Sequence, residues 1–119
     1  MPHERSPLKD RLRRLLLEQA RSGSPATYRE FAQRLDLVPP RTIQRVTHAL
    51  EILMAEDVAA GRQLIGALCV SRSQENLPAR GFFLAARELG VFSGDPDGQE
   101  ARDFHDLELQ RALSFYGRS

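Results

Sequence analysis

The sequence predicts a mainly α-helical domain of the winged-helix or helix-turn-helix kind, with about five helices and a short β-strand or small wing. Residues 27–61 carry the first indication, because they read as a capped helix, a break and a longer second helix. The second is the helical spacing of apolar residues in 6–22, 81–90 and 97–116. The third is a short apolar run without helical period within 63–80, which predicts a strand and a return.

The size and composition of the chain suit one globular unit. Its 119 residues can bury a modest core, so we expect 1–119 to fold as a single domain. Hydrophobic residues make up 41% and charged residues 28%, which is ordinary for a globular protein. No apolar run approaches the roughly 20 residues of a membrane span, and the first residues lack the apolar core of a signal peptide. We therefore expect a cytoplasmic protein without membrane contact.

The first helix is predicted over residues 6–22. Ser6 would cap it, Pro7 suits its first turn, and Gly23 can end it in the left-handed conformation. Its apolar residues have the spacing of one buried face: Leu8, Leu12, Leu15, Leu16 and Ala20. Because the basic residues of this segment lie mainly on the other faces, we interpret the helix as a packing element.

Residues 27–61 contain the predicted helix-turn-helix. Thr27 and Glu30 have the spacing of a capping box, so a short helix should begin at Tyr28. The pair Pro39-Pro40 cannot continue a helix, but a proline can occupy the first position of the next one. A tight break between two helices is therefore expected at this pair.

The third helix is expected from about Pro40 to Ala60, with Gly61 as its end. At 1.5 Å per residue it would be roughly 30 Å long. Its apolar residues form one continuous core stripe: Ile43, Val46, Leu50, Leu53, Met54 and Val58. Polar residues outside this stripe can share an exposed surface.

Residues 63–80 change character. The run from Leu64 to Val70 is apolar without a helical period and reads as a buried strand. Residues 72–76 form a polar turn, and the residue before Pro78 favours an extended backbone. A strand, a turn and a return after a helix-turn-helix would make a small wing.

Two further helices are predicted in the C-terminal part. Residues 81–90 would form a short one that Gly90 ends, and Asp97 with Glu100 repeats the capping-box spacing at the start of a helix over 97–116. The apolar residues of this last helix occupy more than one narrow stripe. Such breadth suggests burial on two sides, by the domain and by a second copy in a homodimer.

Charge is distributed unevenly along the chain. The formal net charge is only +1, but residues 1–48 hold ten Lys/Arg and five Asp/Glu, whereas residues 49–119 hold seven and eleven. The basic half contains the predicted helix-turn-helix, as a phosphate-facing surface would require. The alternative is that these arginines only keep amphipathic helices soluble.

The third helix carries charges that oppose its own dipole. Arg41 and Arg45 lie at the N-terminal end, where partial positive charge disfavours cations by roughly a few tenths of a kcal/mol, and Glu56 and Asp57 lie near the C-terminal end. Helix stability does not explain this arrangement. A DNA phosphate or base edge beside the two arginines would explain its first half, and the alternative is a solvated face with chance placement of charge.

These observations predict a non-enzymatic module that binds DNA through the start of the third helix. Four residues of that helix would make the contact, and two arginines of the preceding helix would touch phosphates: Arg41, Gln44, Arg45 and His48, with Arg29 and Arg34. The alternative is a protein–protein interaction or dimerisation module, without nucleic-acid binding, that uses the apolar surfaces of the third and fifth helices.

No motif for catalysis, for a metal or for a cofactor occurs in the sequence. His3, His48 and His105 are scattered, and no Cys/His cluster has ligand spacing. Neither a Gly-x-Ser-x-Gly elbow nor a phosphate-binding glycine-rich loop is found, and the carboxylates of residues 103–108 are expected on a solvent face. We therefore expect no enzymatic activity, no metal and no cofactor.

The single cysteine, Cys69, cannot form an internal disulfide, which agrees with a reducing cytoplasm. Within an apolar strand it is expected to be a small core residue whose thiol pKa is raised. The alternative is a reactive thiol activated by a neighbouring His or Arg, which would make the protein an enzyme.

Residues 26–46 resemble the helix-turn-helix segment of O6-alkylguanine-DNA alkyltransferases and alkyltransferase-like proteins. The run Ala-Thr-Tyr-Arg-Glu-Phe-Ala from Ala26 is similar to that family's Thr-Tyr-Gly-Glu-Ile-Ala, and Pro-Arg-Thr-Ile-Gln-Arg from Pro40 to its Arg-Ala-Val-Gly-Arg. The resemblance implies binding in the DNA minor groove, where Tyr28 would help rotate a target nucleotide and Arg41 would replace the flipped base in the stack. Tyr28 also fits a core position.

The resemblance does not extend to the reactive site of the family. The Pro-Cys-His-Arg or Pro-Trp-His-Arg motif has no counterpart, since residues 67–72 keep Cys69 without the preceding proline or the following histidine. The resemblance thus implies the fold and DNA contact, but not alkyl transfer.

Overall fold

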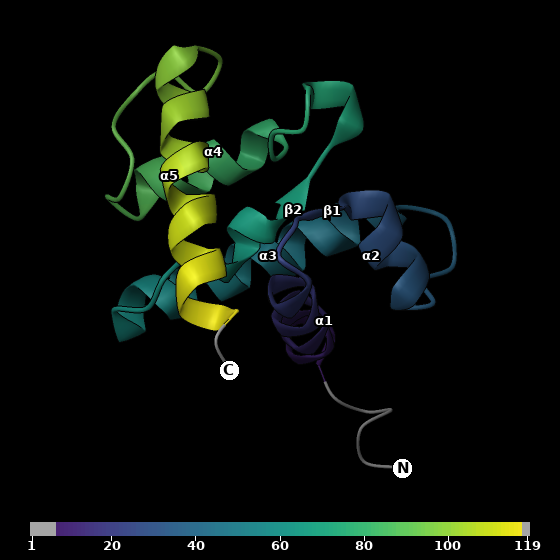
Figure 1. Cartoon of the computed structure of the whole chain (residues 1–119). Helices are drawn as coiled ribbons and strands as arrows, with labels where there is room; N and C mark the ends of the chain where they lie inside the picture. Colours follow the sequence, from purple (N-terminus) through teal and green to yellow (C-terminus); the bar gives the residue numbers. More distant parts are fainter. Residues whose placement is uncertain (1–6, 118–119) are drawn as a thin grey trace.

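The computed structural model describes residues 7–117, which form five α-helices, short 3-10 turns and two very short strands (Figure 1). In chain order the elements are α1 (Leu8–Ser22), β1 (Ala26–Thr27), α2 (Tyr28–Arg34), α3 (Thr42–Ala60), the 3-10 helix η2 (Ile65–Leu68), β2 (Cys69–Val70), the 3-10 helix η3 (Arg72–Gln74), α4 (Arg80–Glu88) and α5 (Gln99–Tyr116). The prediction of a mainly helical fold with a short β element is confirmed. None of the helices in this range is both long and apolar enough to cross a membrane.

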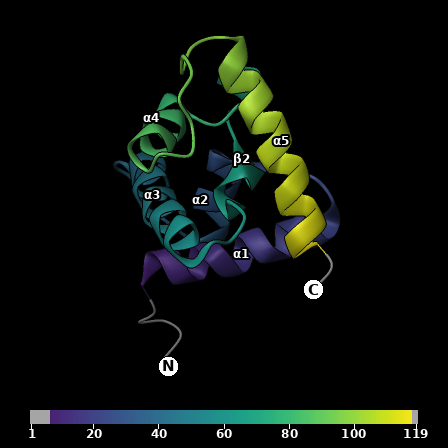
Figure 2. The ribbon, with the colours of Figure 1, turned by 90° about the vertical axis from the view of Figure 1, so that its left-hand side faces the viewer.

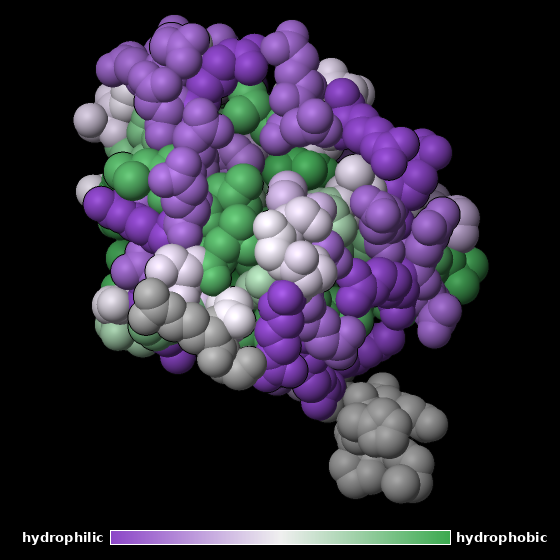
Figure 3. All heavy atoms as spheres, viewed as in Figure 1, coloured by the Kyte–Doolittle hydropathy of each residue, from purple (hydrophilic) through white to green (hydrophobic). Residues whose placement is uncertain are grey.

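The η2–β2 segment lies at the centre of the arrangement. Figure 2 shows α3 and α5 on opposite sides of this segment, with α1 crossing beneath both, and η2 contacts all three helices. In Figure 1, α2 lies on the side of the molecule away from α5. Hydrophobic residues reach the surface alongside α5, whereas hydrophilic residues dominate over α2 and the chain before α4 (Figure 3).

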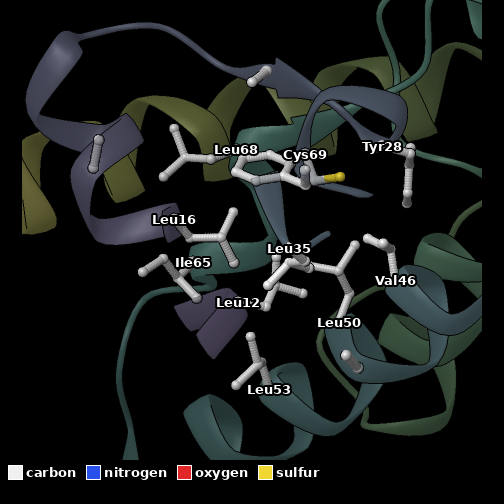
Figure 4. Packing of buried hydrophobic residues seen from close by; sticks show 14 of the residues in the cluster. Leu12, Leu16, Tyr28, Leu35, Val46, Leu50, Leu53, Ile65, Leu68 and Cys69 are labelled. Atoms are coloured by element: carbon white, nitrogen blue, oxygen red, sulfur yellow. The ribbon is translucent and has the colours of Figure 1, made fainter. Parts of the chain in front are cut away.

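The main hydrophobic core lies where α1, α3 and η2 meet (Figure 4). Leu12 and Leu16 of α1, Leu53 of α3, and Ile65 and Leu68 of η2 have no exposed surface. Burial of each such side chain stabilises the folded state by about 1.5–3 kcal/mol. A second apolar cluster joins α4 to α3 and α5. The helical spacing of apolar residues thus identified the helices and the faces that they bury.

The predicted helix caps are partly confirmed. The Thr27–Glu30 capping box is present, since the Thr27 amide donates to the Glu30 carboxylate (2.9 Å) and the Glu30 amide to the Thr27 hydroxyl (3.1 Å). Residues 35–41 form the turn to α3, and α3 ends at the left-handed Gly61 as predicted. The cap predicted at Ser6 lies outside the described residues.

α3 differs from its predicted form at its start and along its stripe. It begins at Thr42 instead of Pro40, because Arg41 takes a left-handed conformation (φ 66°) that cannot continue into a right-handed helix. Two members of the predicted core stripe lie at its margin, since Ile43 is 41% exposed and Val58 is only partly buried. The buried part of the stripe is therefore shorter than the pattern suggested.

The apolar run within 63–80 folds differently from the predicted strand. Its first part winds into η2, and only the two residues of β2 remain extended, paired in parallel with β1. A buried helical turn and a buried strand share the same continuous apolar pattern, so the sequence could not separate them. The return through residues 71–79, called the wing below, is closed by an antiparallel bridge between Ser71 and Leu77.

α4 and α5 follow the prediction with shifted ends. α4 begins one residue before the predicted range 81–90, and α5 begins later than predicted. The capping box predicted from Asp97 and Glu100 is wrong. The Asp97 carboxylate instead accepts from Arg80 Nε (2.9 Å), and the Glu100 carboxylate accepts from the Asp95 amide (3.2 Å).

The carboxylate of Asp57, near the end of α3, has no exposed surface and is held by three donors. Arg13 Nη2 of α1 lies 2.9 Å away, Arg62 Nε 3.2 Å away, and the Ile65 amide donates to it at 3.1 Å. Burying an unpaired carboxylate costs free energy, and the C-terminal end of a helix disfavours negative charge. These three donors offset both effects and explain why an aspartate is tolerated at this position. We call Asp57, Arg13 and Arg62 the Asp57 cluster, which joins α1, α3 and the chain entering η2.

Glu56 also has internal partners. Lys9 Nζ lies 2.6 Å and Arg13 Nη2 3.3 Å from its carboxylate. The hydrogen bond from Lys9 holds the pKa of Glu56 below its ordinary value. The acidic end of α3 therefore binds α1, and this pairing accounts for the two acids whose placement helix stability alone left unexplained.

We predict that Asp57→Ala lowers the free energy of unfolding by about 3 kcal/mol, because Arg13, Arg62 and the buried Ile65 amide all lose the acceptor that joins them. Urea denaturation of wild type and variant measures this loss. Glu56→Ala is the matched control, since the neighbouring carboxylate is more exposed and its removal should cost much less. Equal losses in the two variants would contradict the central role of the Asp57 cluster.

His105 of α5 is a second buried polar group, only 2% exposed. Its Nε2 lies 2.9 Å from the Ala67 carbonyl of η2, which can only accept, so Nε2 carries the hydrogen. Burial lowers the pKa of His105 below its ordinary value of 6.5, against the smaller opposing effects of this hydrogen bond and of Asp106. The neutral ring is therefore the form that the fold holds.

Because the folded-state pKa of His105 is depressed, the unfolded chain takes up the proton first as the pH falls through about 6.5. We predict that the free energy of unfolding decreases between pH 7.5 and pH 5.5, and that His105→Gln, whose amide can still donate to Ala67, reduces this decrease. His48→Gln, at an exposed position, should retain the wild-type pH dependence. Urea denaturation of wild type and both variants at the two pH values measures this decrease. An equal decrease in His105→Gln and His48→Gln would contradict the assignment of the pH dependence to His105.

Candidate nucleic-acid interface

The turn between α2 and α3 places Arg41 at the N-terminal end of α3. Asp36 (φ 56°) and Arg41 (φ 66°) both adopt the left-handed conformation, which costs a non-glycine residue about 1 kcal/mol. Arg41 is the N-cap, and its carbonyl accepts the first helical hydrogen bond from the Arg45 amide (3.0 Å). Among the described residues, no side chain caps this helix end, and its first turn holds no acidic residue. The partial positive charge of the helix end therefore stays uncompensated.

The four residues predicted on the start of the third helix lie together on one exposed face: Arg41, Gln44, Arg45 and His48. Within residues 7–117, no carboxylate lies within ion-pair distance of Arg41 or Arg45. The two guanidinium groups and the helix N-terminus can therefore bind an anion together.

A groove of about 510 Å³ runs beside this face, between α3 and the start of α1. Its α3 wall consists of Arg41, Gln44, Arg45, His48, Ala49 and Ile52. Its other wall consists of Pro7, Leu8 and Lys9. We call it the α1–α3 groove. Ile52 and the α1 wall were not predicted from the sequence, because only the crossing of the two helices brings these residues together.

A second groove, also of about 510 Å³, lies between α2, the first turn of α3 and the wing. Tyr28, Arg29, Ile43 and Arg72 are among its lining residues, and we call it the wing groove. Arg72 was not among the predicted site residues. Its only signal in the sequence is its position directly after the apolar run.

Tyr28 is mainly a core residue. It is 4% exposed, and its hydroxyl accepts a hydrogen bond from the Ala79 amide (2.9 Å). Burial raises the pKa of this hydroxyl, so the phenol stays protonated. Tyr28 lines the wing groove whereas Arg41 lines the α1–α3 groove, so the two residues that the alkyltransferase resemblance pairs do not share a cavity.

The two arginines of α2 differ in their surroundings. Arg29 is exposed and borders the wing groove. Arg34 instead contacts the Glu18 carboxylate (3.3 Å) and the Gln19 side-chain oxygen (2.9 Å) of α1. Arg29 is therefore available for an external phosphate, while Arg34 is held by intramolecular contacts.

Side chains with chemical reactivity are few and separated. In the described part of the chain, no group of three or more His, Cys, Asp or Glu side chains is placed to hold a metal ion. Cys69 has no exposed surface, and burial raises the pKa of its thiol well above the ordinary value. Glu108, expected on a solvent face, is only 8% exposed and pairs with Arg111 (3.2 Å).

Comparisons of the chain with protein-family models, curated proteins and solved structures found no match. The fold is that of a small, mainly helical domain with a short β element, in which α2 and α3 are joined by a turn. The features of this domain that point to a function are the exposed face of α3 and the two grooves beside it.

We predict that Cys69 reacts slowly with a thiol reagent in the native protein, at least about 100-fold more slowly than in urea, because a buried protonated thiol is a poor nucleophile. Absorbance of the released thiolate from an aromatic disulfide reagent measures both rates. Fast stoichiometric labelling of the native protein would instead favour the alternative of a reactive, enzymatic cysteine.

Proposed function

We propose that this protein is a non-enzymatic DNA-binding module that contacts DNA through the first two turns of α3. The observation that supports the proposal is the position of Arg41 and Arg45, which are exposed and, within residues 7–117, without a carboxylate partner at an uncapped helix N-terminus. Phosphates are attracted to such a site by the guanidinium charges and by the free amides of the helix end.

The backbone conformation of Arg41 supports the same proposal. A left-handed arginine is strained, and such strain is typical of positions where the surrounding fold holds a residue for a functional contact. In this conformation Arg41 forms the N-cap of α3, one turn before Arg45. Two cations one turn apart can contact neighbouring phosphates of one strand, which fixes the orientation of the helix on the duplex.

Other residues would extend the contact. Gln44 and His48, on the same face of α3, can donate to base edges or phosphates. Arg29 and Arg72 at the wing groove can bind a phosphate on the other side of the helix start. The alkyltransferase resemblance supports docking in the minor groove. Tyr28 would have to give up its hydrogen bond to Ala79 before it could rotate a nucleotide, so the proposal does not use it.

A second candidate function is homodimerisation through α5. Leu107 and Phe115 of this helix are 46% and 53% exposed, and Arg111 lies midway between them at four-residue spacing. A partly apolar helix surface of this kind can pack against a second copy. The DNA proposal fits a cytoplasmic protein and does not depend on this contact.

We predict that the protein binds a labelled DNA duplex and that Arg41→Ala/Arg45→Ala weakens binding at least about tenfold at low salt. Each lost phosphate contact removes roughly 0.9 from the slope of log K against log salt, so the double variant should lose about 2 from that slope. Fluorescence anisotropy at several salt concentrations measures both quantities.

The matched control is Arg21→Ala/Arg87→Ala, which removes the same charge from exposed positions that line neither groove. It should leave the affinity and the salt slope close to wild type. Equal effects of the two double variants would show a non-specific charge effect and contradict the proposed interface. A tight dimer in light scattering that ignores DNA would favour the α5 candidate instead.

A further inference from the structure

The α1–α3 groove combines an apolar floor with a cationic rim. Leu8, Ala49 and Ile52 supply apolar surface from both walls, and the nine lining residues include no Asp or Glu. Lys9, on the α1 wall, is already paired with Asp10 (3.0 Å) and Glu56 (2.6 Å). The charge that remains available at the groove within the described residues is therefore that of Arg41 and Arg45.

The size of the groove favours a small molecule over a macromolecule. Its volume of about 510 Å³ lies within the range of small-molecule sites, which are mostly apolar with a few convergent polar groups. One face of a protein–protein interface usually involves roughly 20–30 residues, far more than the nine that line this groove. A second copy or a partner helix would therefore leave most of its own surface uncovered here.

The chemistry of the rim selects an anion. A guanidinium group binds a carboxylate through two parallel hydrogen bonds, whereas a neutral ligand would leave both cations unpaired at the edge of an apolar site. Arg41 and Arg45 stand at one end of the α3 wall, and Ile52 lies about two turns further along it. A ligand with a carboxylate at one end and an apolar body would thus match both parts of the groove.

We infer that the α1–α3 groove binds a small apolar carboxylate, with an aliphatic chain or fused aromatic rings lying against Leu8 and Ile52 and the carboxylate on Arg41 and Arg45. The binding site itself does not depend on the proposed DNA contact. Its consequence does: the ligand would occupy the same two guanidinium groups as a phosphate, so ligand and DNA would exclude one another. At ten times its own Kd, such a ligand would raise the apparent Kd for DNA about tenfold.

The test uses naphthalene-2-carboxylate as the probe, with naphthalene-2-carboxamide as its uncharged counterpart. Isothermal titration of the full chain should show saturable one-to-one binding of the carboxylate with a Kd below about 1 mM, and at least about fivefold weaker binding of the amide. Arg41→Ala/Arg45→Ala should remove this preference for the anion. Ile52→Glu, which places a carboxylate on the floor, should weaken binding of the carboxylate at least about tenfold.

The control for Ile52→Glu is Val91→Glu, which also replaces an aliphatic side chain by a carboxylate but at an exposed position outside the groove, and which should bind the probe like wild type. Thermal melting shows whether each variant is folded, and the arginine double variant keeps the test decisive if Ile52→Glu does not fold. Absence of saturable binding, or binding that neither groove variant changes, would overturn the inference.

A DNA titration with and without the probe separates the two proposals. Loss of DNA affinity in parallel with probe binding supports mutual exclusion. Probe binding without any DNA binding overturns the proposed function and leaves the ligand site standing. DNA binding without probe binding overturns the ligand site and leaves the proposed function standing. Tight capture of an acidic peptide in place of the probe also overturns the small-molecule inference.

Discussion

Neutralisation of the Asp57 carboxylate is the constraint on which the arrangement of α1 and α3 depends. A fully buried carboxylate must be paired, and Arg13 can reach it only if α1 crosses α3 at this level. The same crossing brings Lys9 to Glu56 and fills the space between the helices with leucines. The α1–α3 groove lies beside this contact, between the first residues of α1 and the part of α3 that precedes Glu56. Packing at one end of α3 thus shapes the surface at the other.

The arginines within residues 7–117 differ in whether the fold pairs them with a carboxylate. Arg13, Arg62 and Arg80 each meet a carboxylate within the fold. Arg41 and Arg45 have none within residues 7–117, and they lie at a helix end that repels cations. Internal pairing therefore accounts for most of the apparent conflict between charge and helix dipole, but not for the conflict at the start of α3. Within residues 7–117, the unpaired cations at the start of α3 are the physical basis of the proposed DNA contact and of the proposed carboxylate site.

Sequence patterns predicted the helices and their caps well, but they did not predict which distant segments of the chain meet in the fold. The Thr27–Glu30 capping box and the left-handed Gly23 and Gly61 were predictable, since each depends on neighbours in the chain. The exposed face of α3 was also predictable, because it is the complement of the apolar stripe. The winding of η2 was not, because a buried turn and a buried strand look alike in sequence. Nor were the Asp57 cluster and both grooves, whose walls come from segments far apart in the chain.

The parallel pairing of β1 with β2 has a consequence for how this domain can be assembled. Ala26 pairs with Cys69, so α2 and α3 form a long loop whose two ends are joined at their base by main-chain hydrogen bonds. Closing such a loop costs chain entropy before its contacts are complete, so we expect this pairing to form late in folding. We therefore expect that the helix pair that carries the exposed arginines does not fold as an autonomous fragment. Its geometry is completed only when the η2–β2 segment, further along the chain, has docked beneath it.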